Sequence, residues 1–124
     1  NMHAVPASKQ PEREIKYLKY LPGIYPEKTL VLMGDFNCPQ RHSVFGPLKS
    51  LGYHPALQGQ KTTLKRNCFS RDCLASEYDN IFYPQKSMLP VRSGVVYFQE
   101  NMPDQLFPEM ISDHLPVFFG FCFR

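Results

Sequence analysis

The stretch that decides the fold is TLVLMGDFN, residues 29–37, in which a short apolar run ends in a glycine and two polar side chains. Residues 29–33 show no alternation of apolar and polar side chains, which predicts a central strand covered on both faces. Asp35 and Asn37 follow at its C-terminal edge, where a loop can hold polar groups over a rigid sheet. The stretch therefore predicts a sheet that carries a polar site at one edge.

The segment before this stretch predicts a strand and then a helix. Residues 1–5 are expected to form the end of a strand. Residues 12–21 have the apolar spacing of an amphipathic helix, with Ile15 on its buried face, and the dipeptide at 22–23 (Pro-Gly) is expected to end it. The N-terminal part is therefore expected to alternate strand, helix and strand.

The segment after it predicts one more helix and then mostly strands. Residues 44–51 indicate a short helix closed by Gly52, because glycine readily adopts the left-handed conformation at a helix end. Strands are expected at 78–83, 91–98 and 116–124, a loop at 59–72 and a surface connection at 102–109. This order of elements favours a mixed α/β (α+β) fold in a single domain.

Composition excludes several classes of protein. The chain has 124 residues, a hydrophobic fraction of 43%, 10 Phe and 7 Tyr, which supply enough apolar surface for a compact domain and argue against disorder. No run of about 18 or more uncharged apolar residues occurs, so no membrane span is expected. The formal net charge of +3 only weakly favours an anionic partner.

The chain contains four cysteines: Cys38, Cys68, Cys73 and Cys122. They form no repeated C-x-x-C unit, so a zinc site that combines the middle pair with His42 or His54 is disfavoured. A disulfide from Cys38 to one of the middle pair is one expectation, and free thiols are the alternative. Cys122 lies in an apolar run and is expected to pack as a small hydrophobic side chain.

Polar side chains stand at the ends of three expected strands: Asp35 with Asn37, Asp79 with Asn80, and Asp113 with His114. Each pair by itself has a structural explanation, such as a turn or the pairing of buried backbone donors. Carboxylate and amide oxygens are ligands for Mg²⁺ or Mn²⁺, and an imidazole beside a carboxylate suits phosphate binding or proton transfer. The three pairs together therefore indicate metal and phosphate chemistry.

Three motifs in this order, GDFN at 34–37, YDNIFY at 78–83 and SDHLPV at 112–117, resemble the exonuclease/endonuclease/phosphatase superfamily, to which deoxyribonuclease I belongs. The start of the chain, NMH at 1–3, is similar to the family strand that ends in a catalytic histidine. The resemblance implies that residues 1–124 are the C-terminal part of a deoxyribonuclease I-like domain. That domain is a four-layer α/β sandwich with mixed, mainly antiparallel sheets.

The resemblance also implies roles for the first motifs. Asp35 would orient and deprotonate the attacking water or help to hold a metal, and Asn37 would bond the scissile phosphate and fix Asp35. His3 would be a second catalytic imidazole near the leaving group.

The later motifs receive roles in the same way. His114 would contact the phosphate, Asp79 would hold its imidazole in one tautomer, and Asp113 would be a metal ligand. A family threonine is matched by Thr62 or Thr63. The substrate-binding residues are expected to be Asn37, Asn80, Thr63, Lys65 and Arg66.

The function implied by the resemblance is a phosphodiester hydrolase that uses in-line attack of an activated water on phosphorus. Mg²⁺ is the expected cofactor, with Mn²⁺ or Ca²⁺ as alternatives. The basic loop at 61–71 favours nucleic acid as the substrate and hence a nuclease. Hydrolysis of a phospholipid such as sphingomyelin, removal of an inositol 5-phosphate, and a catalytically inert binding or assembly module are the alternatives.

The chain also departs from the family pattern. The principal metal-ligating Glu of the family and the carboxylate that partners His3 belong to the N-terminal half of the domain, whereas this sequence opens at Asn1. We expect the 124 residues to be inactive alone. We also expect the N-terminal half, or a second copy of the chain, to cover apolar surface that would otherwise be exposed.

Overall fold

A four-stranded sheet forms the centre of the computed structural model, which describes residues 1–103 and 106–124. In spatial order its strands are β1 (Met2–His3), β2 (Leu32–Asp35), β4 (Asp79–Pro84) and β3 (Tyr53–Pro55). β1 runs parallel to β2, whereas β4 is antiparallel to both of its neighbours. The sheet is therefore mixed and mainly antiparallel.

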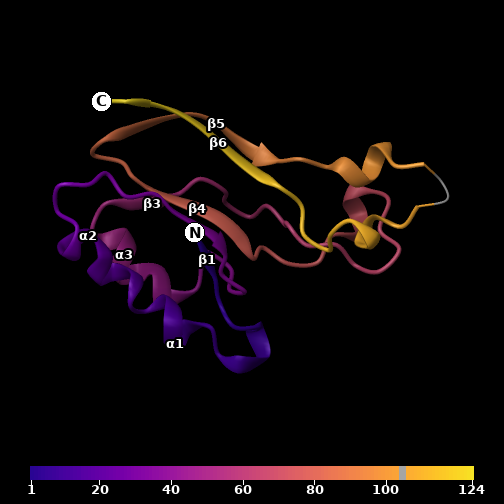
Figure 1. The fold of residues 1–124 in the computed structure, drawn as a ribbon, viewed down its shortest axis with the longest axis horizontal. Coiled ribbons are helices and arrows are strands. Elements are labelled where there is room, and N and C mark those ends of the chain that lie inside the picture. Colours follow the sequence, from indigo (N-terminus) through magenta and orange to yellow (C-terminus); the bar gives the residue numbers. More distant parts are fainter. Residues whose placement is uncertain (104–105) are drawn as a thin grey trace.

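Short helices cover one face of this sheet (Figure 1). The α-helices are α1 (Glu12–Ile15), α2 (Leu21–Ile24) and α3 (Gly46–Ser50). Turns of 3₁₀ helix lie at Ala7–Lys9, Leu18–Tyr20, Ser43–Phe45, Arg71–Cys73, Phe98–Asn101 and Pro108–Met110. Gly52 follows α3 with a φ of 85°, which confirms the left-handed residue expected there.

The single helix expected over residues 12–21 is wrong. The segment breaks into α1, a 3₁₀ turn and α2, and Pro22 and Gly23 lie inside α2 instead of ending the helix before it. A proline is tolerated in the first turn of a helix because the N–H that it lacks would have no partner there. The apolar spacing nevertheless places Ile15 correctly, since it is buried in the core.

A second sheet lies on the opposite side of the central sheet from the helices (Figure 1). It consists of the antiparallel strands β5 (Met88–Val95) and β6 (Val117–Phe123). The ring of Tyr83 on β4 stacks on Phe119 of β6 with a centroid distance of 4.6 Å, so the two sheets are in contact. The fold is thus a mixed α/β arrangement with helices, a four-stranded sheet and a two-stranded sheet in successive layers.

The five strands expected from the sequence exist with different bounds, whereas β3 was not expected. β2 begins later than the apolar run and includes Gly34 and Asp35. Met33 within it is exposed, so the expected covering of both faces is wrong. The surface connection expected at 102–109 includes residues 104–105, which lie outside the described residues.

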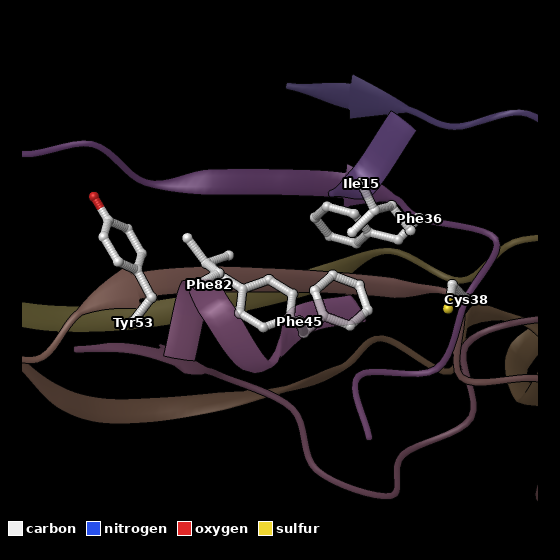
Figure 2. Packing of buried hydrophobic residues seen from close by; sticks show 7 residues of the cluster. Ile15, Phe36, Cys38, Phe45, Tyr53 and Phe82 are labelled. Carbon is white, nitrogen blue, oxygen red and sulfur yellow. The ribbon is translucent and has the colours of Figure 1, made fainter. Parts of the chain in front are cut away.

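The main core lies between the central sheet and the helices (Figure 2). The ring of Phe36 makes edge contacts with Phe45 and Phe82 at centroid distances of 5.5 and 5.4 Å, and Phe45 stacks on Phe82 at 4.7 Å. Phe36 stands between Asp35 and Asn37 in the sequence. Burial of its ring therefore fixes the backbone from which these two polar side chains project.

The cysteines pair differently from the expectation. Cys68 forms a disulfide with Cys73, which contradicts a bond from Cys38 to either of them and leaves no thiolate of this pair for a zinc site. Cys38 is free and buried in the core, and burial, followed by the charge of Glu12, raises its pKa to about 11. Cys122 is exposed, so its expected packing as a buried side chain is wrong.

The surface of the described residues carries many large apolar side chains. Among them are Met33 on β2, Val91 on β5 and Phe121 and Phe123 on β6. Over the same residues, no helix has both the length and the apolar character needed to cross a membrane.

Candidate active site

Strand pairing brings the polar motifs together at one end of the central sheet. His3 on β1 lies opposite Asp35 on β2, and Asp79 on β4 lies opposite Asp35 from the other side. His114 joins them through an isolated bridge to Thr63. Residues from four separate parts of the sequence thus meet around the carboxylate of Asp35.

Asp35 is held in place by Asn37. Its Oδ1 accepts a hydrogen bond from the backbone N–H of Asn37 at 2.8 Å, and its Oδ2 accepts one from the Asn37 side-chain amide at 3.1 Å. The same amide donates to the carbonyl oxygen of Ala4 at 3.0 Å. Asn37 has a φ of 49°, a left-handed conformation that asparagine tolerates. Both amide hydrogens are used inside the protein, so Asn37 fixes Asp35 and has no side-chain donor left for a phosphate in this arrangement.

Asp79 connects Thr62 to His114. Its Oδ2 accepts a hydrogen bond from the Thr62 hydroxyl at 2.6 Å and lies 2.8 Å from Nδ1 of His114. The Thr62 hydroxyl oxygen in turn accepts the backbone N–H of Asp79 at 3.0 Å. An ionised carboxylate only accepts hydrogen bonds, so Nδ1 carries the proton and Nε2 is directed to Oδ2 of Asp35, 3.7 Å away.

The environment of His114 favours its protonated form. Burial of the ring lowers the pKa, but the hydrogen bond to Asp79 and the charges of Asp79, Asp35 and Asp113 outweigh it, and the pKa is raised above 6.5. Burial raises the pKa of Asp79 above 3.8, and the hydrogen bonds from Thr62 and His114 oppose this shift. A raised pKa in the folded state means that His114 stabilises the fold below pH 6.5 and loses this contribution as the pH rises through the raised value.

We expect the imidazole of His114 to titrate with a midpoint above 6.5 in the folded protein, and the Asp79→Asn variant to lower that midpoint. The substitution removes the hydrogen-bonded charge but keeps the burial, which favours the neutral ring. NMR chemical shifts of the ring protons against pH measure both values. Glu77→Gln is the control, because Glu77 pairs with Arg41 at 2.8 Å instead. Equal midpoints in the wild type and Asp79→Asn would contradict the arrangement.

His3 approaches Asp35 from the side opposite to Asp79. Its Nε2 lies 3.5 Å from Oδ2 of Asp35, and its side chain is 80% exposed. This distance is longer than a good hydrogen bond. The Nε2 atoms of His3 and His114 therefore both face one carboxylate oxygen, with His3 open to solvent and His114 partly enclosed.

Three of these residues form a possible metal-binding group. One ligand atom each of Asp35, Asp79 and His114 lies within 4.8 Å of the others. Asp113, the expected metal ligand, is not in this group. Its side chain is exposed, and its backbone carbonyl accepts the N–H of Leu64 at 2.8 Å. Asp113 still lies close enough for its charge to raise the pKa of His114.

The expected substrate-binding residues divide into two groups. Asn80 is buried, and its side-chain amide is paired with the backbone of Leu57 in both directions, at 3.2 and 2.9 Å, so the structure uses it to hold a loop to β4. Thr63 is buried as well, and its hydroxyl accepts the N–H of Ser76 at 2.8 Å. Lys65 and Arg66 are exposed in the turn that follows Thr63.

Thr62 is the residue whose role sequence reasoning did not resolve. The pair Thr62-Thr63 matches one family threonine, and no local pattern separates the two. The bridge of Thr63 to His114 and the backbone hydrogen bonds of Thr62 with Ser76 and Leu115 place the Thr62 hydroxyl beside Asp79. The local sequence signal for this role is only that Thr62 and Thr63 precede Asp79 in the chain.

Comparison with known proteins agrees with this geometry. The model of the Endonuclease/Exonuclease/phosphatase family matches residues 3–114, from the first histidine of the site to the last. Searches of curated proteins and of solved structures gave no match to the chain. The matched region covers most of the 124 residues and every residue of the Asp35, Asp79 and His114 group. The chain therefore belongs to the Endonuclease/Exonuclease/phosphatase family, whose members are metal-dependent phosphodiesterases.

Proposed function

We propose that this protein is a Mg²⁺-dependent phosphodiester hydrolase that acts on nucleic acid. The observation that carries the proposal is the position of Asp35 Oδ2 between two imidazole nitrogens, 3.5 Å from Nε2 of His3 and 3.7 Å from Nε2 of His114. A general base flanked by two potential proton donors suits the hydrolysis of a phosphate ester.

In the proposed reaction, a water held by Asp35 attacks phosphorus and gives its proton to the carboxylate. The bond from phosphorus to the leaving oxygen breaks, and protonated His3 donates a proton to that oxygen. Protonated His114 donates a hydrogen bond from Nε2 to a non-bridging phosphate oxygen, while its Nδ1 proton stays bonded to Asp79. Thr62 and Asp79 act as positioning residues because they fix the ring of His114.

The donor chemistry of the site fits a hard divalent ion. Mg²⁺ is commonly held by one or two carboxylates, with water and substrate phosphate completing its coordination. Asp35 and the exposed Asp113 would hold the ion, while Oδ2 of Asp79 stays engaged with Thr62 and His114. When bound, Mg²⁺ would neutralise negative charge on the phosphoryl oxygens.

We also propose that residues 1–124 form one part of a four-layer α/β sandwich and do not complete the active centre. Among the described residues, the potential ligand group holds two carboxylates and one imidazole that is already paired with Asp79. The exposed apolar side chains of β6, Phe121 and Phe123, support a further layer over the two-stranded sheet. A segment of the same protein or a second copy of the chain would supply it.

The substrate class is tested by assaying the full-length protein on plasmid DNA, RNA, sphingomyelin and phosphoinositides with Mg²⁺. We expect cleavage of nucleic acid that chelation by EDTA abolishes, because the residues present do not themselves neutralise a phosphodiester. The Asp35→Asn variant is the control expected to be inactive, and the Glu77→Gln variant is the control expected to keep its activity. Turnover of lipid alone would overturn the nuclease proposal, and no turnover of any substrate would favour an inert binding or assembly module.

A further inference from the structure

An open apolar cavity adjoins the imidazole of His114. It has a volume of about 550 Å³ and is lined by Phe98, Ile111, Ser112, His114, Leu115 and Pro116. Its lining is almost entirely apolar and includes the aromatic residue Phe98. Ile111 is 68% exposed, so this lining faces solvent and is not part of the packed core. A group attached to a phosphate at His114 would meet this cavity next.

A basic turn lies beside the segment at residues 112–114, part of which lines this cavity. The bridge from Thr63 to His114 and the hydrogen bond from Leu64 N–H to Asp113 at 2.8 Å place the turn beside the site. Lys65 and Arg66 follow directly and are exposed, and the turn is anchored where Asn67 N–H donates to Glu109 at 2.9 Å.

Some basic side chains near the cavity already interact with acidic side chains of the protein. Glu109 lies close enough to Arg66 for the two charges to interact, so Lys65 is the less compensated of the pair. Arg71, further along the loop, lies 4.0 Å over the ring of Tyr97 and pairs with Glu100 at 2.8 Å. The cations that lie beside the segment lining the cavity are therefore Lys65 and Arg66.

From this order of features we propose that the cavity receives a nucleobase next to the scissile phosphate, with an adjacent phosphate at Lys65 and Arg66. The inference rests on the proposed hydrolase function and adds the substrate subsite. An apolar lining that includes an aromatic residue suits the face of a base. A phosphate on each side of that base matches a polynucleotide, whereas an inositol phosphate has no apolar group to fill the cavity.

The test measures binding of fluorescently labelled oligothymidylate to the protein in EDTA, without turnover. The ligand for comparison is an abasic oligodeoxyribose phosphate of the same length, which has the same charge and no bases. The variants are Phe98→Ala and Ile111→Ser, and Met110→Ser is the matched control. Met110 neighbours Ile111 in the sequence, is 70% exposed and does not line the cavity.

We expect Ile111→Ser and Phe98→Ala to weaken oligothymidylate binding by about fivefold or more, while abasic binding stays unchanged. Met110→Ser should bind both ligands as the wild type does. Equal affinity of the wild type for the two ligands, or equal effects of Ile111→Ser and Met110→Ser, would overturn the proposal. Tighter binding to phospholipid vesicles, lost in Ile111→Ser, would assign the cavity to an acyl chain and overturn it as well.

These outcomes are independent of the hydrolase assay. The binding measurement needs no metal and no bond cleavage, so a base-dependent affinity can be found even if no substrate is hydrolysed. Hydrolysis of nucleic acid with no difference between the two ligands would instead leave the proposed function intact and remove the subsite.

Discussion

Replacing His114 with alanine is expected to lower the kcat for phosphodiester hydrolysis by at least about 100-fold while the protein stays folded. The ring is fixed, since Nδ1 is bonded to Asp79 and Nε2 faces Asp35, and in the proposed reaction Nε2 donates to the phosphate. Its loss removes charge stabilisation in the transition state and leaves the strands unchanged. Steady-state kinetics on the substrate identified by the assay above, with circular dichroism as the check on folding, measure the effect.

The partner of His114 extends this prediction to a pair. Asp79→Ala should reproduce most of the loss, because the protonated ring of His114 is no longer held in one orientation by the Asp79 carboxylate. The double variant should cost little more than His114→Ala, since residues that act as a unit are not additive. His42→Ala is the control, as His42 is exposed and caps a 3₁₀ turn through Val44 N–H. Near-full activity of His114→Ala, or additive losses in the double variant, would show that the pair is not part of the active site.

Gly34→Ala is expected to lower the free energy of unfolding by at least about 2 kcal/mol and to detach β1 from β2. Gly34 has a φ of 145°, which an alanine adopts only with strain, of order 1–3 kcal/mol. A Cβ there would overlap the backbone carbonyl of Met2, so β1 would have to move away and lose its hydrogen bonds, each about 1 kcal/mol. Because His3 sits on β1, the same change should remove it from Asp35.

Urea unfolding and amide hydrogen exchange together measure this effect. The N–H of Ala4 donates to the Asp35 carbonyl at 2.9 Å, and its protection reports whether β1 is still in place. Gly23→Ala is the matched control, because a Cβ at Gly23 meets nothing within 4 Å and its φ is not positive. We expect that variant to unfold at the same or a higher urea concentration. Unchanged protection of Ala4 in Gly34→Ala would contradict the role given to Gly34.

The apolar runs and the turn residues were sufficient to predict most elements of the fold. The strand before GDFN, the strand in YDNIFY and the last strand exist, because short runs of apolar and β-branched residues depend on local chemistry. The break of the segment at residues 12–21 into separate helical pieces could not be predicted from the sequence. It depends on the packing of Ile15 in the core and on a proline that lies in the first turn of α2. The bounds of β2 were wrong because pairing with β1 and β4, and not hydrophobicity, sets where a strand ends.

The pairing of the cysteines and the identity of the buried polar side chains could not be predicted without the tertiary structure. Cys38 lies in the core cluster that contains Phe36, whereas Cys68 lies in the other core cluster and is within disulfide distance of Cys73, with their Cα atoms 5.5 Å apart. Asn80 follows Asp79 directly in the sequence and shares its polarity, yet alternation along β4 turns it to the Leu57 backbone. Composition gives no means to assign the two neighbours to opposite sides of a strand before the pairing is known.

The sequence by itself determined that acidic, amide and imidazole side chains stand at the ends of apolar strands, and this was enough to place the chain in its family. Only the tertiary structure decided that Asp35 is the centre of the group, with His3 opposite it on one strand and Asp79 on the other. The physical reason is that cross-strand neighbours are fixed by register, which depends on contacts between distant segments. Gly34 permits that register by leaving room for β1, and the bridge from Thr63 to His114 completes the site.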